Sequence, residues 1–484
     1  MSSLCTAIIS DLHLTDPEPP RHETKSRHPL WKKFKTKEFF IDESLIQFLA
    51  HIQNLAKGQK IELILNGDIF DFDSVMSLPE NAIFSISWLE RWRGLFPKQE
   101  RSVFKIKVVL EEHKKFIDAL GAFIRDGNDL VIIPGNHDVE LHFPEVQSEI
   151  LQSLNLSEVQ LQHVRFTDWF YISNGDTLIE HGHQQDPYCM CENPLNPFLL
   201  DYNELSIRLP FGNVACRYIM NGLGLFNPHV EKNYIMSISG YLKFFFKYLI
   251  TAQPLIIWTW LWGAVATLWH VTADRFAETY RGHISNEKRA VDAAVKSKST
   301  PAVVRELQEL FASPATNDPI LIAKELWLDR LFLIVVGFIS LYFLGNFLKT
   351  MVSISFFWIF LPFALLLPFF LFYARSVTSL VSQYKEPSES LLAKQAEVSG
   401  VRRIIYGHTH IARHEYYGMV EHLNSGSWSP AFTNVECTET IEKNTYIWIS
   451  PSPEDTNIRK AELFQFTTKK VPGTFEGGKV PGTF

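Results

Sequence analysis

The apolar positions of this chain form short runs that end abruptly in polar residues, as buried strands do. These runs cover Cys5–Ser10, Ile61–Asn66, Leu130–Pro134, Thr177–Glu180 and Arg402–Tyr406. Helical stretches at Asp42–Ala56 and Glu111–Arg125 lie between the first three. This alternation of strands and helices predicts an α/β sandwich. Shorter strands expected around Val420–Asn424 and Thr445–Ser450 could complete a second sheet.

A second pattern consists of long uncharged stretches at Tyr248–Ala273, Leu331–Leu348 and Thr350–Ala374. Each is long enough for a membrane-crossing helix of roughly 20 residues, although any one of them could also be a buried helix of a soluble domain. The last two flank a single lysine, Lys349, and predict a membrane hairpin that turns there, with Lys349 at its tip. The sequence therefore predicts two full crossings.

The first stretch differs from the other two in its tryptophans. Pro254 breaks its start, and tryptophan is the residue favoured at membrane interfaces. We therefore expect a re-entrant or interfacial helix here; four crossings, with Leu242–Thr251 as part of a broken hairpin, are the alternative. The tryptophans are Trp258, Trp260, Trp262 and Trp269.

These patterns divide the chain into four regions. Residues 1–190 and 401–466 are predicted to be the two parts of one catalytic domain. Residues 191–400 are predicted to be a helical insertion with membrane segments at about 242–273, 331–348 and 350–374. Residues 467–484 repeat the letters KVPGTF and are expected to be a disordered tail.

Charge and cysteine content concern partners and compartment. The net charge of −7, from 46 basic and 53 acidic residues, gives no case for nucleic-acid binding by bulk electrostatics. Five scattered cysteines suit reduced thiols in the cytosol. Met1–Ser10 lacks the basic region of a secretory signal. We expect an inner (cytoplasmic) membrane protein whose catalytic domain faces the cytoplasm, as the basic residues bordering the apolar stretches also indicate.

Metal-binding residue types follow each of the five predicted strands. Loops at the carboxyl ends of strands in an α/β sheet share one crevice, so these side chains can converge. Each block alone is more often a turn or a surface cluster, but five ordered blocks together indicate a site. The blocks are Asp11 with His13; Gly67-Asp68 with Asp71; Gly135-Asn136-His137-Asp138; His181 with His183; and Gly407-His408 with His410.

The donor types indicate which metals bind. Carboxylate, imidazole and amide oxygen without thiolate favour Mn²⁺, Fe or Zn²⁺ over a structural zinc knot. The donors are also too many for one ion that must keep an open position, so we expect two divalent ions, with Asp68 able to bridge them. The candidate ligands are Asp11, His13, Asp68, Asn136, His181, His408 and His410.

The order D-x-H, GD, GNHD, H and GHTH resembles the calcineurin-like metallophosphoesterase family, over about 400 residues of the chain. The resemblance implies a four-layer αββα sandwich, here interrupted by the helical membrane insertion. It places Asp11, His13, Asp68 and His410 on one metal, with Mn²⁺ first among the candidates. It places Asp68, Asn136, His181 and His408 on the other. It also implies that His137 contacts the reacting phosphate and stabilises charge or protonates the leaving oxygen. We expect Asp71, Asp138 and His183 to orient ligands, with a direct metal role for His183 as the less favoured alternative.

The apolar region lies between His181 and His408. If these two histidines share a metal, the chain must leave and re-enter the bilayer on the same side, so the number of crossings must be even. Such an insertion predicts an amphiphilic substrate. The nearest analogy is to UDP-2,3-diacylglucosamine hydrolases, from which the chain departs by carrying His137 where their motif has arginine. A nucleotide or nucleic-acid phosphodiesterase and a non-catalytic membrane scaffold are the alternatives.

Overall fold

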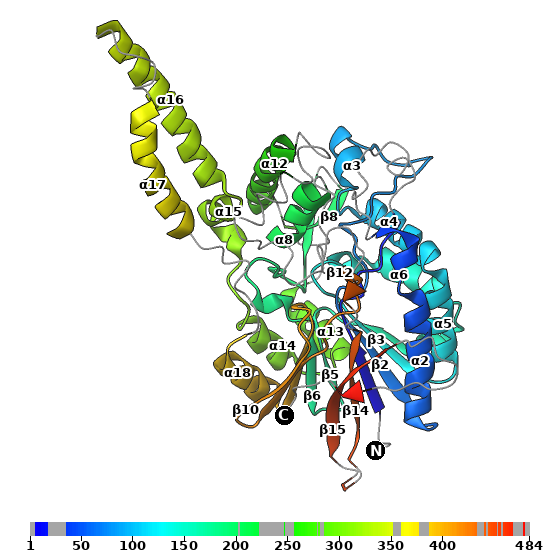
Figure 1. The fold of residues 1–484 in the computed structure, drawn as a ribbon. Coiled ribbons are helices and arrows are strands. Elements are labelled where there is room, and N and C mark those ends of the chain that lie inside the picture. The colour runs from blue at the N-terminus through cyan, green and yellow to red at the C-terminus, as the bar shows by residue number, and fades with distance from the viewer. Residues whose placement is uncertain are drawn as a thin grey trace.

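The computed structural model shows an α/β body from which two helices project (Figure 1). It describes residues 5–17, 35–201, 204–221, 246, 256–277, 279–280, 285–351, 360–376, 387–432, 440–441, 444–452, 454–455, 458–467 and 478–479. Outside these ranges lie residues 18–34, most of Leu242–Thr251, Pro254 and most of the repeat tail.

Four parallel strands form one side of a seven-stranded sheet. The strand order is β16-β15-β14-β1-β2-β3-β4, and β1 to β4 run parallel. β14 pairs antiparallel with β1, placing Ile449 opposite Thr6. The strands are β1 (Cys5–Ile9), β2 (Ile61–Asn66), β3 (Asp129–Ile133), β4 (Val164–Phe166), β14 (Thr445–Pro451), β15 (Arg459–Gln465) and β16 (Gly478–Lys479).

A five-stranded sheet packs against the first. Its order is β10-β11-β9-β6-β5, in which β6, β9 and β11 run parallel. The expectation that Thr445–Ser450 would join this second sheet is wrong, because those residues form β14 beside β1; Val420–Asn424 does join it, as β11. The strands are β5 (Phe170–Ser173), β6 (Thr177–Glu180), β9 (Arg403–Tyr406), β10 (Arg413–Tyr417) and β11 (Val420–Asn424).

Successive side chains of a strand point to opposite faces of its sheet, and both faces of each sheet are buried. Ile8 and Ile64 of the first sheet meet Ile179 and Ile405 of the second in the core between the sheets. The outer face of the first sheet packs against α2 (Asp42–Ala56), α4 (Gln99–Glu112), α5 (Lys114–Arg125) and α6 (Pro144–Ser153). The outer face of the second packs against α13 (Asn286–Lys296), α14 (Pro301–Gln308) and α18 (Glu389–Ser399). The four-layer αββα sandwich is therefore confirmed.

Two of these observations refine the sequence reading. The helix expected at Glu111–Arg125 is divided at His113, whose backbone φ of −102° and ψ of 24° separate α4 from α5. The helices α13, α14 and α18 lie within the stretch predicted as the insertion, yet they cover the second sheet. Because no other described helix packs on that face, part of the inserted sequence supplies a layer of the sandwich.

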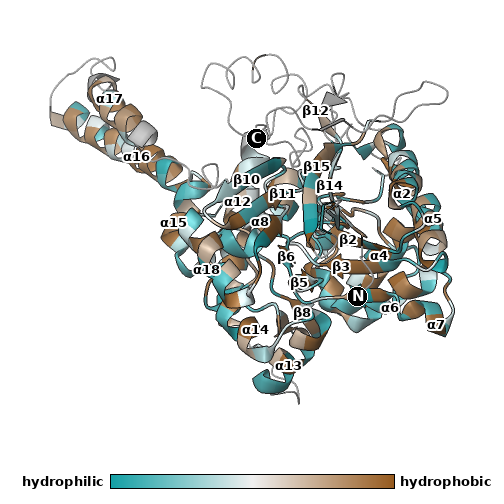
Figure 2. Cartoon of the chain, turned by 90° about the horizontal axis from the view of Figure 1, so that it is seen from below, coloured by the Kyte–Doolittle hydropathy of each residue, from teal (hydrophilic) through white to brown (hydrophobic). Residues whose placement is uncertain are grey.

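The apolar stretches of the insertion form α12 (Ile256–Phe276), α16 (Leu328–Met351) and α17 (Phe360–Ser376). Among the described residues, α16 alone is long and apolar enough to cross a bilayer. The predicted turn at Lys349 is wrong, because α16 continues through Lys349 to Met351. The hydroxyl of Tyr373, late in α17, donates to Asp329 Oδ2, early in α16, at 2.8 Å, so the two helices are antiparallel. Figure 2 shows them as an arm extending from the body.

Candidate metal centre

The loops after β1, β2, β3, β6 and β9 meet at one edge of the two sheets. Main-chain hydrogen bonds join them: Asp11 N donates to Gly67 O at 3.1 Å, and His13 N donates to Asp68 O at 2.9 Å. Gly407 N donates to His181 O at 2.9 Å, which links β6 to β9 across the insertion. The structure thus brings together strand ends that the sequence separates by hundreds of residues.

Asp11, His13 and His410 form the first group of possible ligands, with one donor atom of each within 4.8 Å of the others. His410 Nε2 lies 3.0 Å from Asp11 Oδ1 and 3.4 Å from His13 Nε2. Donors about 2.0–2.2 Å from one ion lie at roughly these separations from each other. The three side chains can therefore hold one ion.

Asp68, His181 and His408 form a second group of the same size. His181 Nε2 lies 3.2 Å from Asp68 Oδ2, and the same oxygen lies 3.8 Å from His13 Nε2 in the first group. One carboxylate therefore faces both groups, which is the arrangement a bridging ligand requires. The division of ligands between two ions stays a prediction, and this geometry supports it.

Hydrogen bonds orient two of the imidazoles. His181 Nδ1 donates to the Asn66 carbonyl at 2.9 Å, which leaves Nε2 to face Asp68. His408 Nε2 lies 3.0 Å from Asp186 Oδ2, which leaves the opposite ring nitrogen for the centre. Such partners fix the tautomer and ring position of a metal ligand. The sequence reasoning missed Asp186, although a carboxylate five residues after His181 was a signal that could have found it.

Asn136 supplies the clearest sign that the residues fit a metal. Its side chain is almost fully buried, and its Oδ1 accepts no hydrogen bond from any described residue. A buried amide oxygen without a partner costs about 1–3 kcal/mol. Coordination of a cation would remove this cost, and an amide oxygen is a suitable donor for Mn²⁺.

His137 lies at the rim of the cluster, with a ring centroid 5.0 Å from that of His13. Its Nδ1 is 3.3 Å from Asp71 Oδ1, so Asp71 orients the ring. Burial lowers the pKa of His137, but the carboxylates of Asp68 and Asp71 outweigh burial and raise this pKa to about 10. Without bound metal the imidazole is therefore protonated at neutral pH and can donate a proton.

Asp138 and His183 have different surroundings. Asp138 accepts from Ile69 N at 2.7 Å and from Gly135 N at 2.5 Å, so it ties the loop after β3 to the loop after β2. His183 belongs to none of the ligand groups found among the described residues. Burial, reinforced by His181, holds the pKa of His183 well below its usual range, so this ring is neutral and packs behind His181.

The backbone is strained where the ligands lie. Five candidate ligands have positive φ angles, a conformation that costs a non-glycine residue roughly 1–3 kcal/mol and that clusters at functional sites. Glycines allow the close approach of neighbouring loops: a Cβ on Gly67 would lie 2.4 Å from the His181 ring, and one on Gly135 would lie 2.2 Å from Asp68 Oδ1. The strained ligands are Asp11 (54°), His13 (48°), Asp68 (50°), His408 (66°) and His410 (59°).

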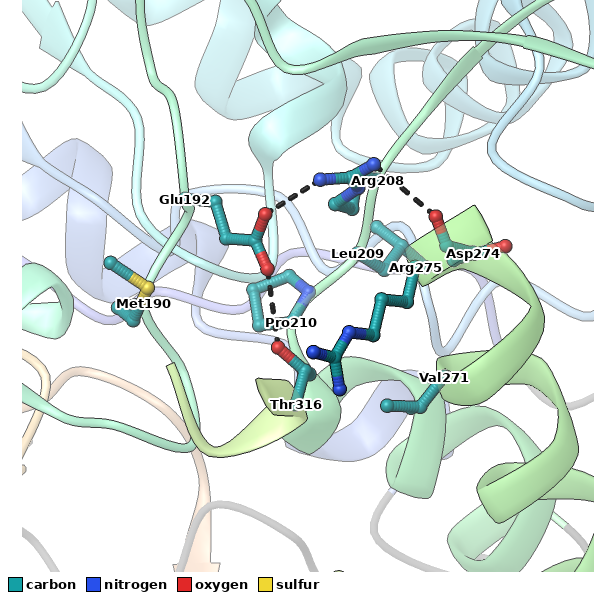
Figure 3. Close-up of a pocket in the computed structure, with 9 residues that line it drawn as sticks. All are labelled: Met190, Glu192, Arg208, Leu209, Pro210, Val271, Asp274, Arg275 and Thr316. Atoms are coloured by element: carbon teal, nitrogen blue, oxygen red, sulfur yellow. Dashed lines mark hydrogen bonds and ion pairs between the residues drawn. The ribbon is translucent and has the colours of Figure 1, made fainter. Parts of the chain in front are cut away.

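A separate pocket lies beside the carboxyl-terminal end of α12 (Figure 3). Arg208 pairs with Glu192 at 2.6 Å across it, and Thr316 donates to the same carboxylate at 3.2 Å. The cavity measures about 20 Å³, which is room for a single water molecule. The pocket is therefore no substrate site, and the chemistry belongs to the cluster of carboxylates and imidazoles.

Comparison with known proteins agrees with this geometry. The family model described as calcineurin-like phosphoesterase matches residues 6–206, which contain five of the seven candidate ligands. No curated protein matches the chain. The structure adds His408 and His410 from beyond the matched residues to the same cluster. The chain therefore carries a calcineurin-like phosphoesterase domain and is a metal-dependent phosphoester hydrolase, of a family that uses a dinuclear divalent metal centre.

Proposed function

We propose that this protein is a membrane-associated phosphoesterase that hydrolyses a phosphate ester or pyrophosphate bond in an amphiphilic, lipid-linked substrate. The observation that carries the proposal is that one body joins two ligand groups, both faced by the Asp68 carboxylate, to an exposed apolar helical arm. Mn²⁺ is the metal we expect first. Molecules resembling a UDP-diacylglucosamine are a substrate class that combines a pyrophosphate bond with acyl chains.

In this proposal Asp11, His13 and His410 would hold one ion, His181, His408 and Asn136 would hold the other, and Asp68 would contribute to both. Bound ions supply Lewis-acid polarisation of the phosphoryl group and a water of lowered pKa. The protonated His137, held by Asp71 at 3.3 Å, donates a proton to the leaving oxygen. No side chain of the protein needs to form a covalent bond to phosphorus.

The arm formed by α16 and α17 supports membrane association. Large apolar side chains point outward along α16, among them Phe332, Phe338 and Phe343, each more than half exposed. Contiguous exposed apolar surface of this kind marks a membrane or protein contact. A length of 24 residues at 1.5 Å per residue is enough to span a hydrocarbon core of about 30 Å.

The exposed face of α12 supports a second contact with the bilayer. At 3.6 residues per turn, positions 7, 11 and 18 residues after Trp258 return to within about 20° of the same direction. These positions are Val265, Trp269 and Phe276, and Trp258 and Trp269 are 65% and 76% exposed. Because tryptophan favours the membrane interface, we infer that α12 lies along the bilayer surface. The basic residues that border the apolar stretches, among them Arg275, Arg281 and Arg375, support a catalytic body that faces the cytoplasm.

The deciding experiment compares substrates that share a scissile bond but differ in acyl chains. Full-length protein in lipid nanodiscs with Mn²⁺ would be assayed on a UDP-diacylglucosamine, on its acyl-free UDP-sugar counterpart, on a cyclic nucleotide and on single-stranded DNA. We expect the lipid to be hydrolysed at least about tenfold faster than the others, because only it can partition to α12 and the arm.

Asp68→Ala serves as the inactive control, to exclude a contaminating phosphatase. Equal rates on the acyl-free compound would contradict the lipid substrate, and a preference for the nucleotides would favour a nucleotide phosphodiesterase. Fewer than one bound metal per chain, with no hydrolysis of any substrate, would favour a non-catalytic scaffold.

A further inference from the structure

Two short helical turns just beyond the family-matched residues lie against the metal centre. α8 (Phe211–Ala215) and η5 (Cys216–Met220) follow the second strand of a small hairpin and continue one into the other. They carry Asn213 and Arg217, which are 0% and 1% exposed. Polar groups buried to this degree need partners, and the Asn213 amide nitrogen and the two terminal nitrogens of Arg217 have them.

Asn213 contacts that loop directly. Its Nδ2 donates to the main-chain carbonyl of Asn136 at 2.6 Å and to Asp73 Oδ2 at 2.6 Å. A side-chain amide has two N–H groups, and here each faces an acceptor. The reverse orientation would place an oxygen against two oxygens, so these contacts determine which way the Asn213 amide points.

The anchor for this contact is itself held. Asp73 Oδ1 accepts from Arg217 Nη2 at 3.1 Å, and Arg217 Nη1 donates to Leu95 O at 2.8 Å. The main-chain carbonyl of Asp73 accepts from Asn221 Nδ2 at 2.7 Å. Because Asp73 and Arg217 are both buried and paired, moving either one would leave an uncompensated charge in the interior.

Asn213 contacts the peptide group between Asn136, the expected metal ligand, and His137, the expected proton donor. The carbonyl of the Asn136–His137 peptide accepts from Asn213, and its N–H donates to Asp68 Oδ1 at 2.8 Å. A peptide group is planar, so bonds at both ends fix its orientation. That orientation in turn sets where the Asn136 side chain begins, and its Oδ1 is the buried acceptor with no described partner.

We propose that Asn213 is a positioning residue that aims the Asn136 amide oxygen at the metal centre. The proposal rests on the metal site of the proposed function. It places one determinant of that site in the inserted region, outside residues 6–206. Partners that orient metal ligands typically contribute 10-fold to 100-fold in metal affinity, so the effect is measurable.

The test is a calorimetric titration of the metal-free, full-length protein in nanodiscs with Mn²⁺, for the wild type, Asn213→Ala and Asn213→Asp. We expect two binding events in the wild type. In both variants the event that involves Asn136 weakens 10-fold to 100-fold, while the other event stays within about twofold. Asn213→Asp should have the larger effect, because a carboxylate of the same shape would repel both acceptors.

Asn221→Ala is the matched control, since it removes a buried amide that donates to the main-chain carbonyl of the same Asp73. We expect it to lower the melting temperature about as much as Asn213→Ala. Both metal affinities should stay within about twofold of the wild type, because Arg217 still holds the Asp73 side chain that Asn213 contacts. If the two alanine variants shift affinity equally, Asn213 is only structural and the proposal is overturned. If Asn213→Asp does not fold, Asn213→Ala and Asn213→Ser decide. A wild type that binds fewer than two ions overturns the proposed function instead.

Discussion

The helices α12 and α16 are both long and apolar, but they have opposite surroundings. One side of α12 packs on α8 and η5, and the hydroxyl of Tyr218 there lies 2.8 Å from His270 Nδ1. Most of α16 projects from the body, and only 11% of its most apolar window is buried against the rest of the protein. α12 is therefore part of the scaffold behind the metal centre, whereas α16 belongs to an arm.

The surroundings of one glycine on each helix illustrate the difference in packing between α12 and α16. On α12, Gly263 and Ala264 allow the helix to approach η5 so closely that a Cβ on Gly263 would lie 2.8 Å from Tyr218 O. On α16, a Cβ on Gly337 would meet nothing within 4 Å. The backbone of α12 therefore meets that of η5 at Gly263, whereas Gly337 of α16 has no close neighbour, and length and composition do not reveal this difference.

The largest effect on turnover should follow from a substitution in the metal centre of the body. We expect Asp68→Ala to lower turnover more than about 10⁴-fold, because it removes the carboxylate that faces both ligand groups and each 1.36 kcal/mol of lost stabilisation is tenfold in rate. Metal content should fall while membrane binding is unchanged, as measured by elemental analysis and vesicle flotation. Loss of flotation in this variant would show that the body and the arm are not separable.

His137→Ala should lower turnover about 10²-fold to 10⁴-fold, the usual contribution of a positioned acid. Metal content should stay at the wild-type value, because His137 is not an expected ligand. A substrate with a good leaving group, such as a nitrophenyl ester, should recover much of the lost rate, since its oxygen needs no proton. A proportional loss of metal would instead place His137 among the ligands.

Ile339→Arg tests the arm, because this residue lies near the middle of α16 and is half exposed. A charge at the centre of a membrane helix costs roughly 3 kcal/mol on insertion scales, which is more than 10²-fold in partitioning. We expect the variant to be released from membranes more readily than Ile339→Leu, with equal turnover on a soluble nitrophenyl ester. Unchanged membrane retention would mean that α16 does not cross the bilayer.

The smallest effects compare the two glycines. Gly263→Ala should destabilise the body by about 1–3 kcal/mol through overpacking against Tyr218. Gly337→Ala should leave stability unchanged or raise it by up to about 1 kcal/mol, because alanine is the better helix former and meets no neighbour. Denaturant unfolding in detergent measures both. Equal changes would contradict the different packing of α12 and α16.

Local pattern was enough for the strands and for most of the candidate site. β2, β6 and β11 begin and end where the sequence predicts, because alternating or continuous apolar residues bounded by polar ones define a buried strand within a few residues. The turn at Lys349 was predicted wrongly because local pattern does not show where a long apolar helix ends. A single charge does not end a helix whose backbone hydrogen bonds continue on both sides of it.

Contacts between residues far apart in the sequence could not be predicted from the pattern of apolar and polar positions. Asn213 and Asn136 are 77 residues apart, and no spacing rule pairs them. Asp186 reaches His408 across 222 residues. The order of residues determined which groups could bind metal and which stretches avoid water, since both are properties of side chains and their neighbours in sequence. Which apolar helix packs inside, and which polar side chain aims a ligand, depended on close packing in three dimensions.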